Sequence, residues 1–497
     1  MGRFKRYLVV FGLAVLLFVA VFSDVVEGQA ITRFAYEFNV FKPLAVYATD
    51  RYIIMAGGSG GPAVVAVNRT SGSLVKSWYY SAGDPNSCDI AFDGSYVYVG
   101  CIRYNDYVFL GKYSYPDLNA AWERMLTGFA YSVIDIDANN GNLYFVIRGY
   151  AGSSDFVAGY FSSDGSGYVV KSVSLPSDYT DVIFVSGVIG TGYYDQLGLC
   201  GFAKFTYSGA TYNTLFYLEM ALGSGTVYKN VMVQVPSVPS DGYNLVEAWL
   251  NGSKVIFSVG RYVAVFNRDT NEFESVRSIS VSGASYYYDS DIEISGNLYM
   301  VTRYYNSTLA NYTLAVVKFD TGFNVLASYG YSGTYNNFYD FADYGDNVAV
   351  VNAAGSYYMF YVPLGIGIPY KVVASRISAS FTTVSTTGYS ISYSFGTPSV
   401  SASTISSSAL SLSTGYLYLD VVTTVTNTVT TTTTDTVTTT DTVTTTTTVV
   451  HAVPYPYTFT TTVTTVVYQA PSLDIYVVVF VVAALIAVAI AYSYRRK

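Results

Sequence analysis

A unit of about 45 residues recurs along most of the chain, and this repeat limits the possible folds more than any other feature. Each unit has an acidic residue, a short apolar run, a turn and a second run, as in Asp89–Gly94 followed by Tyr96–Val99, except that the first copy, Ala45–Met55, lacks the opening acid. The turns fall at positions 50, 94, 141, 187, 252, 296 and 345, which are 44 to 49 residues apart except for an interval of 65 after 187. A second pair of runs follows each first pair, so each unit predicts four strands.

Seven such units predict an all-β fold, a seven-bladed β-propeller over residues 31–372, which is a closed ring with few exposed strand edges. Rings of six or eight blades are the alternatives. The long interval predicts an insertion near Tyr193–Tyr212, and residues 31–38 are expected to add the outermost strand to the last blade.

Both ends of the chain carry membrane-targeting patterns. Residues 1–30 have a basic start, an apolar run and small residues before Ile31, which is typical of a secretory signal peptide, with a retained N-terminal anchor as the alternative. Residues 473–494 are long and apolar enough to predict a transmembrane helix, and the basic tail 495–497 belongs on the cytoplasmic side. We therefore expect a single-pass membrane protein with its N-terminus outside the cell and its C-terminus in the cytoplasm.

Between the propeller and the helix the chain is rich in Ser and Thr. Residues 373–422 alternate polar and aromatic residues, which predicts a β-like module or a linker. Residues 423–472 form a Thr-rich stretch, with 19 Thr among the 26 residues from Thr423 to Thr448. Such a segment cannot bury a core, so we expect an extended, O-glycosylated stalk. A β-rich tract packed on the propeller is the alternative.

Two resemblances accompany these patterns. The stretch Val64–Trp78 resembles the strand–turn–strand pattern of quinoprotein-like and YVTN-type propeller repeats, and this resemblance implies a fold rather than an activity. A Thr-rich stem followed by a C-terminal anchor resembles the arrangement of archaeal surface proteins.

Composition excludes several classes of function. A single His among 497 residues leaves almost no material for histidine catalysis or His-ligated metals, and we expect no cofactor and no metal. The net charge of −8 without a basic stripe argues against nucleic-acid binding. Without residues 1–30 and 475–497, 20 basic and 32 acidic residues remain, a balance suited to an acidic medium in which carboxylates are partly protonated.

The recurring acids are expected to lie at one rim of the central channel, where they could bind a cation or a polar ligand. Arginines recur near the end of the paired strand, so structural ion pairs across the hairpin are the alternative. Two acids without a matching arginine, Asp181 and Asp340, are the better ligand candidates. The other rim acids are Asp89, Asp135, Glu247 and Asp291, and the arginines are Arg103, Arg148, Arg261 and Arg303.

Three further groups are candidates for recognition or covalent modification. Tyrosine clusters expected in loops suit contact with proteins or sugars: Tyr193, Tyr194, Tyr286, Tyr287, Tyr288, Tyr304 and Tyr305. Glycosylation sequons begin at Asn68, Asn251, Asn306 and Asn311. Cys88 and Cys101 bracket one predicted hairpin and fall almost opposite each other, so we expect a disulfide, which leaves Cys200 over.

Two motifs point weakly to chemistry. Ser163–Gly167 is a fragment of the Asp-box that sialidase-like enzymes repeat, and Gly57–Gly61 lacks the Lys and the helix of a phosphate-binding loop. The sequence therefore favours a non-enzymatic, membrane-anchored propeller that recognises an extracellular protein or glycan. The alternatives are a structural component of a cell envelope or surface layer and an extracytoplasmic enzyme, either a glycan hydrolase or a quinoprotein-like oxidoreductase.

Overall fold

The computed structural model describes residues 30–450 apart from positions 39, 150–152, 239–245, 295–297, 308–310, 334–337, 345–346, 354–356, 366–371, 390–391, 399–400, 406–407, 411–413 and 431–439. The chain divides into two compact units. The larger comprises residues 31–421 with 451–453, and the smaller comprises residues 1–30, 422–450 and 454–497. The predicted signal peptide, transmembrane helix and cytoplasmic tail lie outside the described residues. In the part that is described, no helix is both long and apolar enough to cross a membrane.

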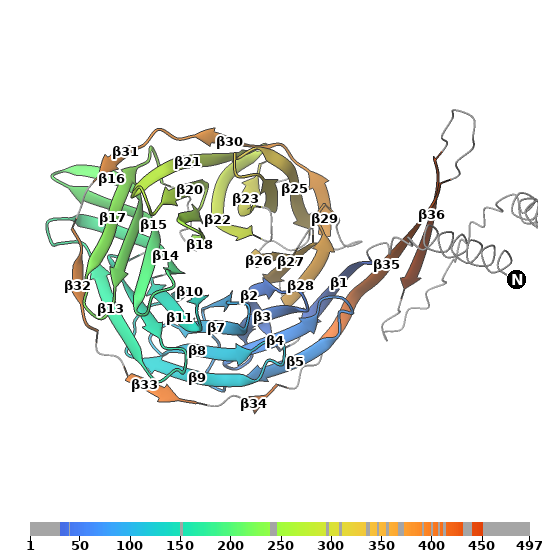
Figure 1. The fold of residues 1–497 in the computed structure, drawn as a ribbon, viewed down its shortest axis with the longest axis horizontal. Helices are drawn as coiled ribbons and strands as arrows, with labels where there is room; N and C mark the ends of the chain where they lie inside the picture. The colour runs from blue at the N-terminus through green and yellow to red at the C-terminus, as the bar shows by residue number, and fades with distance from the viewer. Residues whose placement is uncertain are drawn as a thin grey trace, which may run out of the picture. The chain divides into compact units, whose positions relative to one another are not determined.

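The larger unit is a ring of β-sheets around a central opening (Figure 1). Seven sheets are described, each with four antiparallel ring strands, and we call each sheet a blade. Contacts between the innermost strands join every blade to the next. The prediction of an all-β propeller is therefore confirmed.

The ring strands follow the sequence, with the innermost strand of each blade first. The first three blades are β2 (Lys42–Ala48), β3 (Tyr52–Gly58), β4 (Pro62–Asn68) and β5 (Leu74–Tyr79); β6 (Ser87–Phe92), β7 (Tyr96–Arg103), β8 (Tyr107–Ser114) and β9 (Ala120–Thr127); and β10 (Val133–Asn139), β11 (Asn142–Arg148), β12 (Asp155–Phe161) and β13 (Tyr168–Ser174).

The next three blades follow the same plan. They are β14 (Thr180–Gly190), β15 (Gln196–Tyr207), β16 (Ala210–Ala221) and β17 (Val227–Gln234); β18 (Val246–Asn251), β19 (Lys254–Val259), β20 (Tyr262–Asn267) and β21 (Glu272–Val281); and β22 (Ala284–Ile294), β23 (Leu298–Asn306), β24 (Asn311–Phe319) and β25 (Val325–Gly333).

The last blade is assembled from both ends of the ring. It contains β26 (Phe338–Tyr344), β27 (Asn347–Ala353), β28 (Tyr357–Pro363) and, as its outer ring strand, β1 (Ala30–Phe38). Phe34 is paired with Tyr361 and Phe38 with Tyr357 in this antiparallel junction. The expected closing strand from residues 31–38 is therefore present.

Burial explains why the middle strands are almost continuously apolar. In β3 and β4 nearly every residue is buried, because neighbouring blades cover both faces of the sheet. In the same blade, the outer ring strand β5 is mostly exposed or half-buried. The apolar clusters contain strands from adjacent blades, so the core of this unit is a series of layers between blades.

Residues 372–409, which we call the belt, run around the outside of the ring. Six short belt strands each add a fifth strand to one blade, in the reverse of the sequence order of the blades (Figure 1). They are β29 (Val372–Arg376) on β25, β30 (Ala379–Thr383) on β21, β31 (Thr387–Tyr389) on β17, β32 (Ser394–Gly396) on β13, β33 (Ser401–Thr404) on β9 and β34 (Ser408–Ala409) on β5. The segment expected as a β module or linker therefore forms no module of its own.

Two strands continue the Thr-rich sequence beyond the belt. They are β35 (Thr414–Thr430), which neighbours β1, and β36 (Thr440–Val450). The prediction of an extended stalk is not supported in this stretch, because the described residues on both sides of 431–439 are strands. The rest of the proposed stalk, from residue 451, is not described.

The structure places one predicted turn differently. Gly187 lies inside β14 and not at a hairpin tip, and the turn that follows is Thr191–Asp195. The expected insertion near Tyr193–Tyr212 takes the form of longer strands, since β14, β15 and β16 have 11 or 12 residues each.

Candidate functional site

The acids of the inner strands connect adjacent blades. The Asp89 carboxylate in β6 accepts a hydrogen bond from the backbone N–H of Ile136 in β10, at 2.6 Å. In the same way, Asp135 in β10 accepts one from Val188 in β14, at 2.5 Å. Each carboxylate therefore satisfies a backbone donor of the neighbouring inner strand, which gives these recurring acids a structural role.

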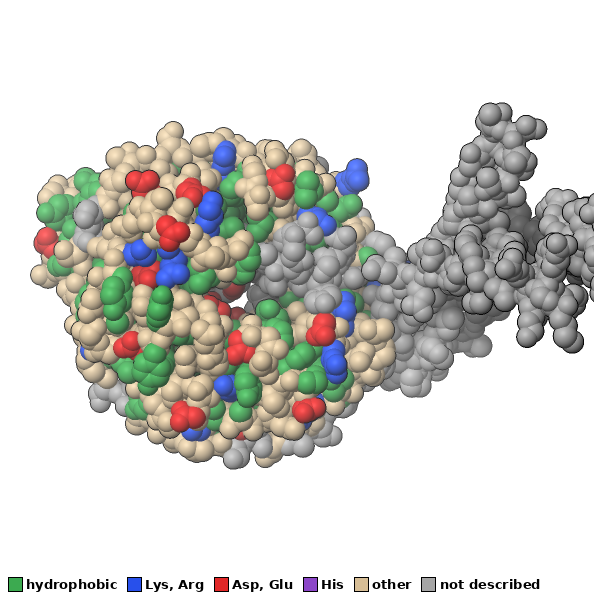
Figure 2. All heavy atoms as spheres, viewed as in Figure 1, with side chains coloured by type: hydrophobic (Ala, Val, Ile, Leu, Met, Phe, Trp, Pro, Cys, Tyr) green, Lys and Arg blue, Asp and Glu red, His purple; other side chains and the backbone are tan. Residues whose placement is uncertain are grey.

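A third carboxylate, which the sequence pattern did not single out, extends this arrangement. Asp137 accepts hydrogen bonds from the backbone of Gly190, at 2.8 Å, and of Ala138, at 2.7 Å. Burial raises the pKa of Asp137 to about 6. Burial also raises the pKa of Asp89, and burial together with the charge of Asp89 raises that of Asp135. Acidic side chains are visible in the central opening of the ring (Figure 2).

Asp181 does not belong to this set. In the fourth blade, Gly187 takes the position that Asp135 has in the third blade. Gly187 precedes Val188 just as Asp135 precedes Ile136, and each of these two following residues donates its N–H to an acid of the blade before. A Cβ at Gly187 would lie 2.6 Å from the carbonyl oxygen of Val246, which explains why a carboxylate is missing there. Asp181 is exposed at the far end of β14 with a φ of 52°.

The other three predicted rim acids share the register of Asp89 on their own blades. Asp89 is paired with Gly100, Glu247 with Ser258, Asp291 with Val301 and Asp340 with Val351. Glu247 is half-buried, and the side chains of Asp291 and Asp340 are outside the described set. In the described part of the chain, no group of three His, Cys, Asp or Glu side chains is arranged to hold a metal ion.

In the described part of the chain, three of the four predicted arginines contact residues other than the acid of their own hairpin. Arg103 forms an ion pair with Asp106 at 3.2 Å. The guanidinium of Arg148 is buried and donates to the carbonyl of Gly149, and Arg261 donates to the Ser237 hydroxyl. Arg303 lies in β23 opposite Leu314.

Most of the predicted tyrosine loops are strands. Tyr286, Tyr287 and Tyr288 lie in β22, and Tyr304 and Tyr305 lie in β23. Tyr304 is fully buried. Tyr305, the next residue, is half-buried, because successive side chains of a β-strand point to opposite faces of the sheet.

Tyr193 and Tyr194 do lie in a turn, between β14 and β15, and they are 64% and 66% exposed. The Tyr193 carbonyl accepts a hydrogen bond from the Tyr144 hydroxyl at 2.8 Å, which fixes the turn to the neighbouring blade. The Tyr194 ring packs edge-on against Tyr160, with centroids 5.0 Å apart. The turn is therefore held in place while both aromatic side chains face solvent.

The adjacent turn of the same blade extends this surface. The carboxylate of Asp195 accepts a hydrogen bond from the backbone of Gly223, which joins the β14–β15 and β16–β17 turns. At the start of β17, Val227 is 38% and Tyr228 is 55% exposed. We call Tyr193, Tyr194, Val227 and Tyr228 the tip patch. It lies on the hairpin face of the ring, which carries the turns between the first and second and the third and fourth strands of each blade.

The four sequons lie at hairpin ends on opposite faces. Asn68 and Asn251 belong to turns on the hairpin face, whereas Asn306 and Asn311 flank a turn between second and third strands. Asn251 is exposed, and the side-chain oxygen of Asn68 accepts hydrogen bonds from Thr70 and Ser71. The Asp-box fragment forms a similar turn, in which Asp164 accepts hydrogen bonds from Ser162 and Ser166.

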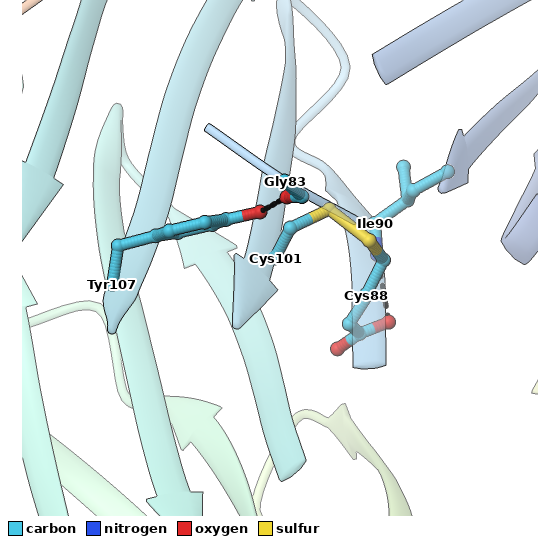
Figure 3. Close-up of a disulfide and its surroundings, with 6 residues drawn as sticks. Gly83, Cys88, Ile90, Cys101 and Tyr107 are labelled. Atoms are coloured by element: carbon cyan, nitrogen blue, oxygen red, sulfur yellow. Dashed lines mark hydrogen bonds between the residues drawn. A yellow bond between two sulfur atoms is a disulfide. The ribbon is translucent and has the colours of Figure 1, made fainter. Parts of the chain in front are cut away.

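Cys88 and Cys101 are opposite each other in β6 and β7 and form a disulfide (Figure 3). Beside it, the Tyr107 hydroxyl donates a hydrogen bond to the carbonyl of Gly83 at 2.6 Å. Cys200 is a free, buried thiol. The disulfide joins the two innermost strands of one blade.

Replacing Cys88 and Cys101 with serine is expected to lower the free energy of unfolding by about 2–3 kcal/mol, because the closed loop of this size no longer restricts the unfolded chain. Chemical denaturation of the double variant and of wild type checks this. Cys200→Ser is the control for removing a thiol without removing a cross-link. Equal stability of the double variant and wild type would contradict the prediction.

One buried ion pair of the described residues has no signal in the sequence. Glu219 in β16 is 2% exposed and accepts two hydrogen bonds from Arg268, at 2.8 and 2.9 Å. Gln196 and Tyr217 also donate to this carboxylate. Arg268 follows β20, so the pair joins two adjacent blades. No local pattern marks these residues, since they are 49 positions apart.

No protein-family model and no curated protein matches the chain. Among solved structures, it is similar to one described as "Structure of U3-55K", with a TM-score of 0.43 and 9% identity over 68% of this chain and 99% of that one. It is also similar to "Crystal structure of RRP9 WD40 repeats", with a TM-score of 0.43 and 10% identity over 68% of this chain and 100% of that one. Similarity at this level carries no argument about function, and no match supports the quinoprotein, YVTN or archaeal resemblance.

Proposed function

We propose that this protein is a membrane-anchored extracellular propeller that recognises a protein or glycan through the tip patch. The exposed pair Tyr193–Tyr194 on a fixed turn carries the proposal. Tyrosine offers a large contact area, a hydroxyl group and few rotatable bonds, so it binds partners at a low entropic cost. A turn that is already fixed before binding reduces that cost further.

Three further features support this function over the alternatives. Three acids of the inner ring, Asp89, Asp135 and Asp137, are used in hydrogen bonds between blades, which leaves less of the acid ring for a hydrolase. A cross-strand disulfide is typical of an oxidising compartment. The N-terminal and C-terminal sequence patterns predict secretion and anchoring.

Binding measurements on residues 31–421 test the proposal. A Tyr193→Ala/Tyr194→Ala double variant is expected to lose at least tenfold in affinity for cells or arrayed glycans, since exposed aromatic residues dominate such contacts. Tyr104→Ala is the matched control, because Tyr104 is 55% exposed and lies at the β7–β8 turn on the opposite face.

The outcomes separate the candidate functions. Saturable binding that the double variant loses and Tyr104→Ala retains supports recognition by the tip patch. Saturable binding that both variants retain would place recognition elsewhere. Absence of binding together with ordered self-assembly of the fragment would favour a structural envelope role.

A further inference from the structure

The belt keeps a strict seven-residue register around the ring. Six belt positions spaced by seven residues are each paired with one residue of an outer ring strand: 374 with Tyr331, 381 with Ile279, 388 with Val233, 395 with Val173, 402 with Leu126 and 409 with Trp78. The next position in this series is 416, which lies in β35, the neighbour of β1. One heptad therefore corresponds to one blade.

The belt sequence repeats with the same period. At six positions spaced by seven residues, from the belt to just beyond it, an apolar residue or proline is followed by serine: 377–378, 384–385, 391–392, 398–399, 405–406 and 412–413. Where the structure describes these apolar positions they are half-buried, as at Ile377, Val384 and Ile405. The described serines that follow them, Ser378, Ser385 and Ser392, are exposed.

Two aromatic belt residues contact a different blade from the one with which their belt strand pairs. Phe381 belongs to β30, which pairs with β21, yet its ring packs on Phe319 and Phe323 of the next blade, at 4.8 and 5.6 Å between centroids. Tyr393 lies just before β32, and its ring centroid is 6.3 Å from that of Phe184 in the adjacent blade. These side chains pack against the adjacent blade from the outer side of the ring and so connect neighbouring blades.

Backbone and side-chain hydrogen bonds support this attachment. The Ile377 N–H donates to the carbonyl of Ser328, and Val384 does the same to Val276. At the far end, the Leu410 N–H donates to the carbonyl of Ser77, and the Ser77 hydroxyl donates back to the carbonyl of Leu410 at 2.8 Å.

We propose that the belt is an intramolecular hoop that holds the ring closed and makes its blades unfold together. β1 closes the ring at one junction only, whereas the belt crosses the junctions between six consecutive blades. Its continuity matters as much as its contacts, because a continuous chain prevents neighbouring blades from separating. Its outer face of Ser and Thr on short strands also protects the outer edge of the ring from pairing with other chains.

Cutting the hoop tests the role of continuity. A specific protease site inserted between Ser385 and Thr386 in the full-length chain allows cleavage after folding, with all belt strands still present. Cleavage is expected to lower the unfolding midpoint of the ring by about 5 °C or more, the range of a loss of a few kcal/mol in a large domain. The control carries the same site at Ser208–Gly209 in the exposed β15–β16 turn.

Side-chain variants test the contacts independently. Phe381→Ser/Phe395→Ser removes two half-buried rings, whereas Thr382→Ala/Ser394→Ala changes exposed neighbours on the same belt strands. The first pair is expected to reduce hydrogen-exchange protection in the belt and to lower the unfolding midpoint, and the second pair is expected to leave both near wild type.

Two results would overturn the proposal. One is an unchanged midpoint after complete cleavage at Ser385–Thr386. The other is a stable dimer that exchanges belts between copies, because the hoop then closes an assembly and not its own ring.

Discussion

Replacing Arg268 with methionine is expected to lower the free energy of unfolding by about 3–5 kcal/mol, because the Glu219 carboxylate would stay buried without its partner. The side chain of Glu219 is only 3% exposed and that of Arg268 15%. Burial alone would raise the pKa of Glu219, but the hydrogen bonds and charge of Arg268 outweigh it and lower this pKa. Chemical denaturation of the ring at neutral pH measures the loss.

Two controls separate the buried charge from the lost side chain. In the Glu219→Gln/Arg268→Met variant neither charge remains, so we expect part of the stability to return. Lys254→Met removes an exposed ion pair with Glu274, at 2.7 Å, and is expected to cost less than about 1 kcal/mol. Similar losses for Arg268→Met and Lys254→Met would contradict the prediction.

The inner-ring acids are expected to make the ring more stable at mildly acidic pH than at neutral pH. Burial raises the pKa of Asp137 from its usual 3.8 to about 6. Between these two values the folded chain binds a proton that the unfolded chain has lost, so stability falls as the pH rises and the loss is complete above about pH 6–7. A two-unit shift corresponds to about 3 kcal/mol, and partial exposure of the side chain reduces our expectation to about 1–2 kcal/mol.

Denaturant unfolding at pH 4.5 and pH 7.5 measures this effect. In Asp137→Asn we expect the difference in stability between the two pH values to shrink, since an amide does not titrate but still accepts a hydrogen bond from Gly190. Asp117→Asn changes an exposed carboxylate and serves as the control. An unchanged pH dependence in Asp137→Asn would show that other groups cause it.

These raised pKa values give a physical reason for the expectation, made from the amino-acid composition, that the protein suits an acidic medium. The raised pKa values of Asp89 and Asp135 act in the same direction as that of Asp137. An acidic medium would protonate part of this group and relieve the repulsion between its members. Wild-type stability as a function of pH therefore also bears on the environment in which the chain works.

Local sequence patterns predicted a large part of the fold. The recurring strand–turn–strand unit led to a propeller, and the pattern of residues 31–38 led to its closing strand β1. Both predictions depend on short-range periodicity, which a strand carries in its own residues. The placement of a turn at Gly187 was wrong because Gly in a strand can also mark a close backbone approach, here to Val246.

The candidate functional residues were harder to predict. Cys88 and Cys101 were found because a hairpin of known register sets which residues face each other. Aromatic clusters suit both loops and strands, so the prediction of loops for the tyrosines of β22 and β23 was wrong, and only the pairing of these two strands within the ring decided between the two. The sequence showed that acids recur on the inner strands but not that they connect blades. Their partners are backbone N–H groups 47 and 53 residues away along the chain.

The sequence by itself determined that this chain is a repetitive all-β protein, because the repeat, the turn residues and the alternation of apolar residues are local properties. It also contains the seven-residue period of the belt, but a Ser/Thr-rich heptad has no evident partner until the ring exists. Only the tertiary structure decided that this segment surrounds the propeller, that Glu219 meets Arg268 and that carboxylates hold neighbouring blades together. Each of these features joins residues of different blades, and such contacts are set by the closure of the ring and not by the order of the residues within one blade.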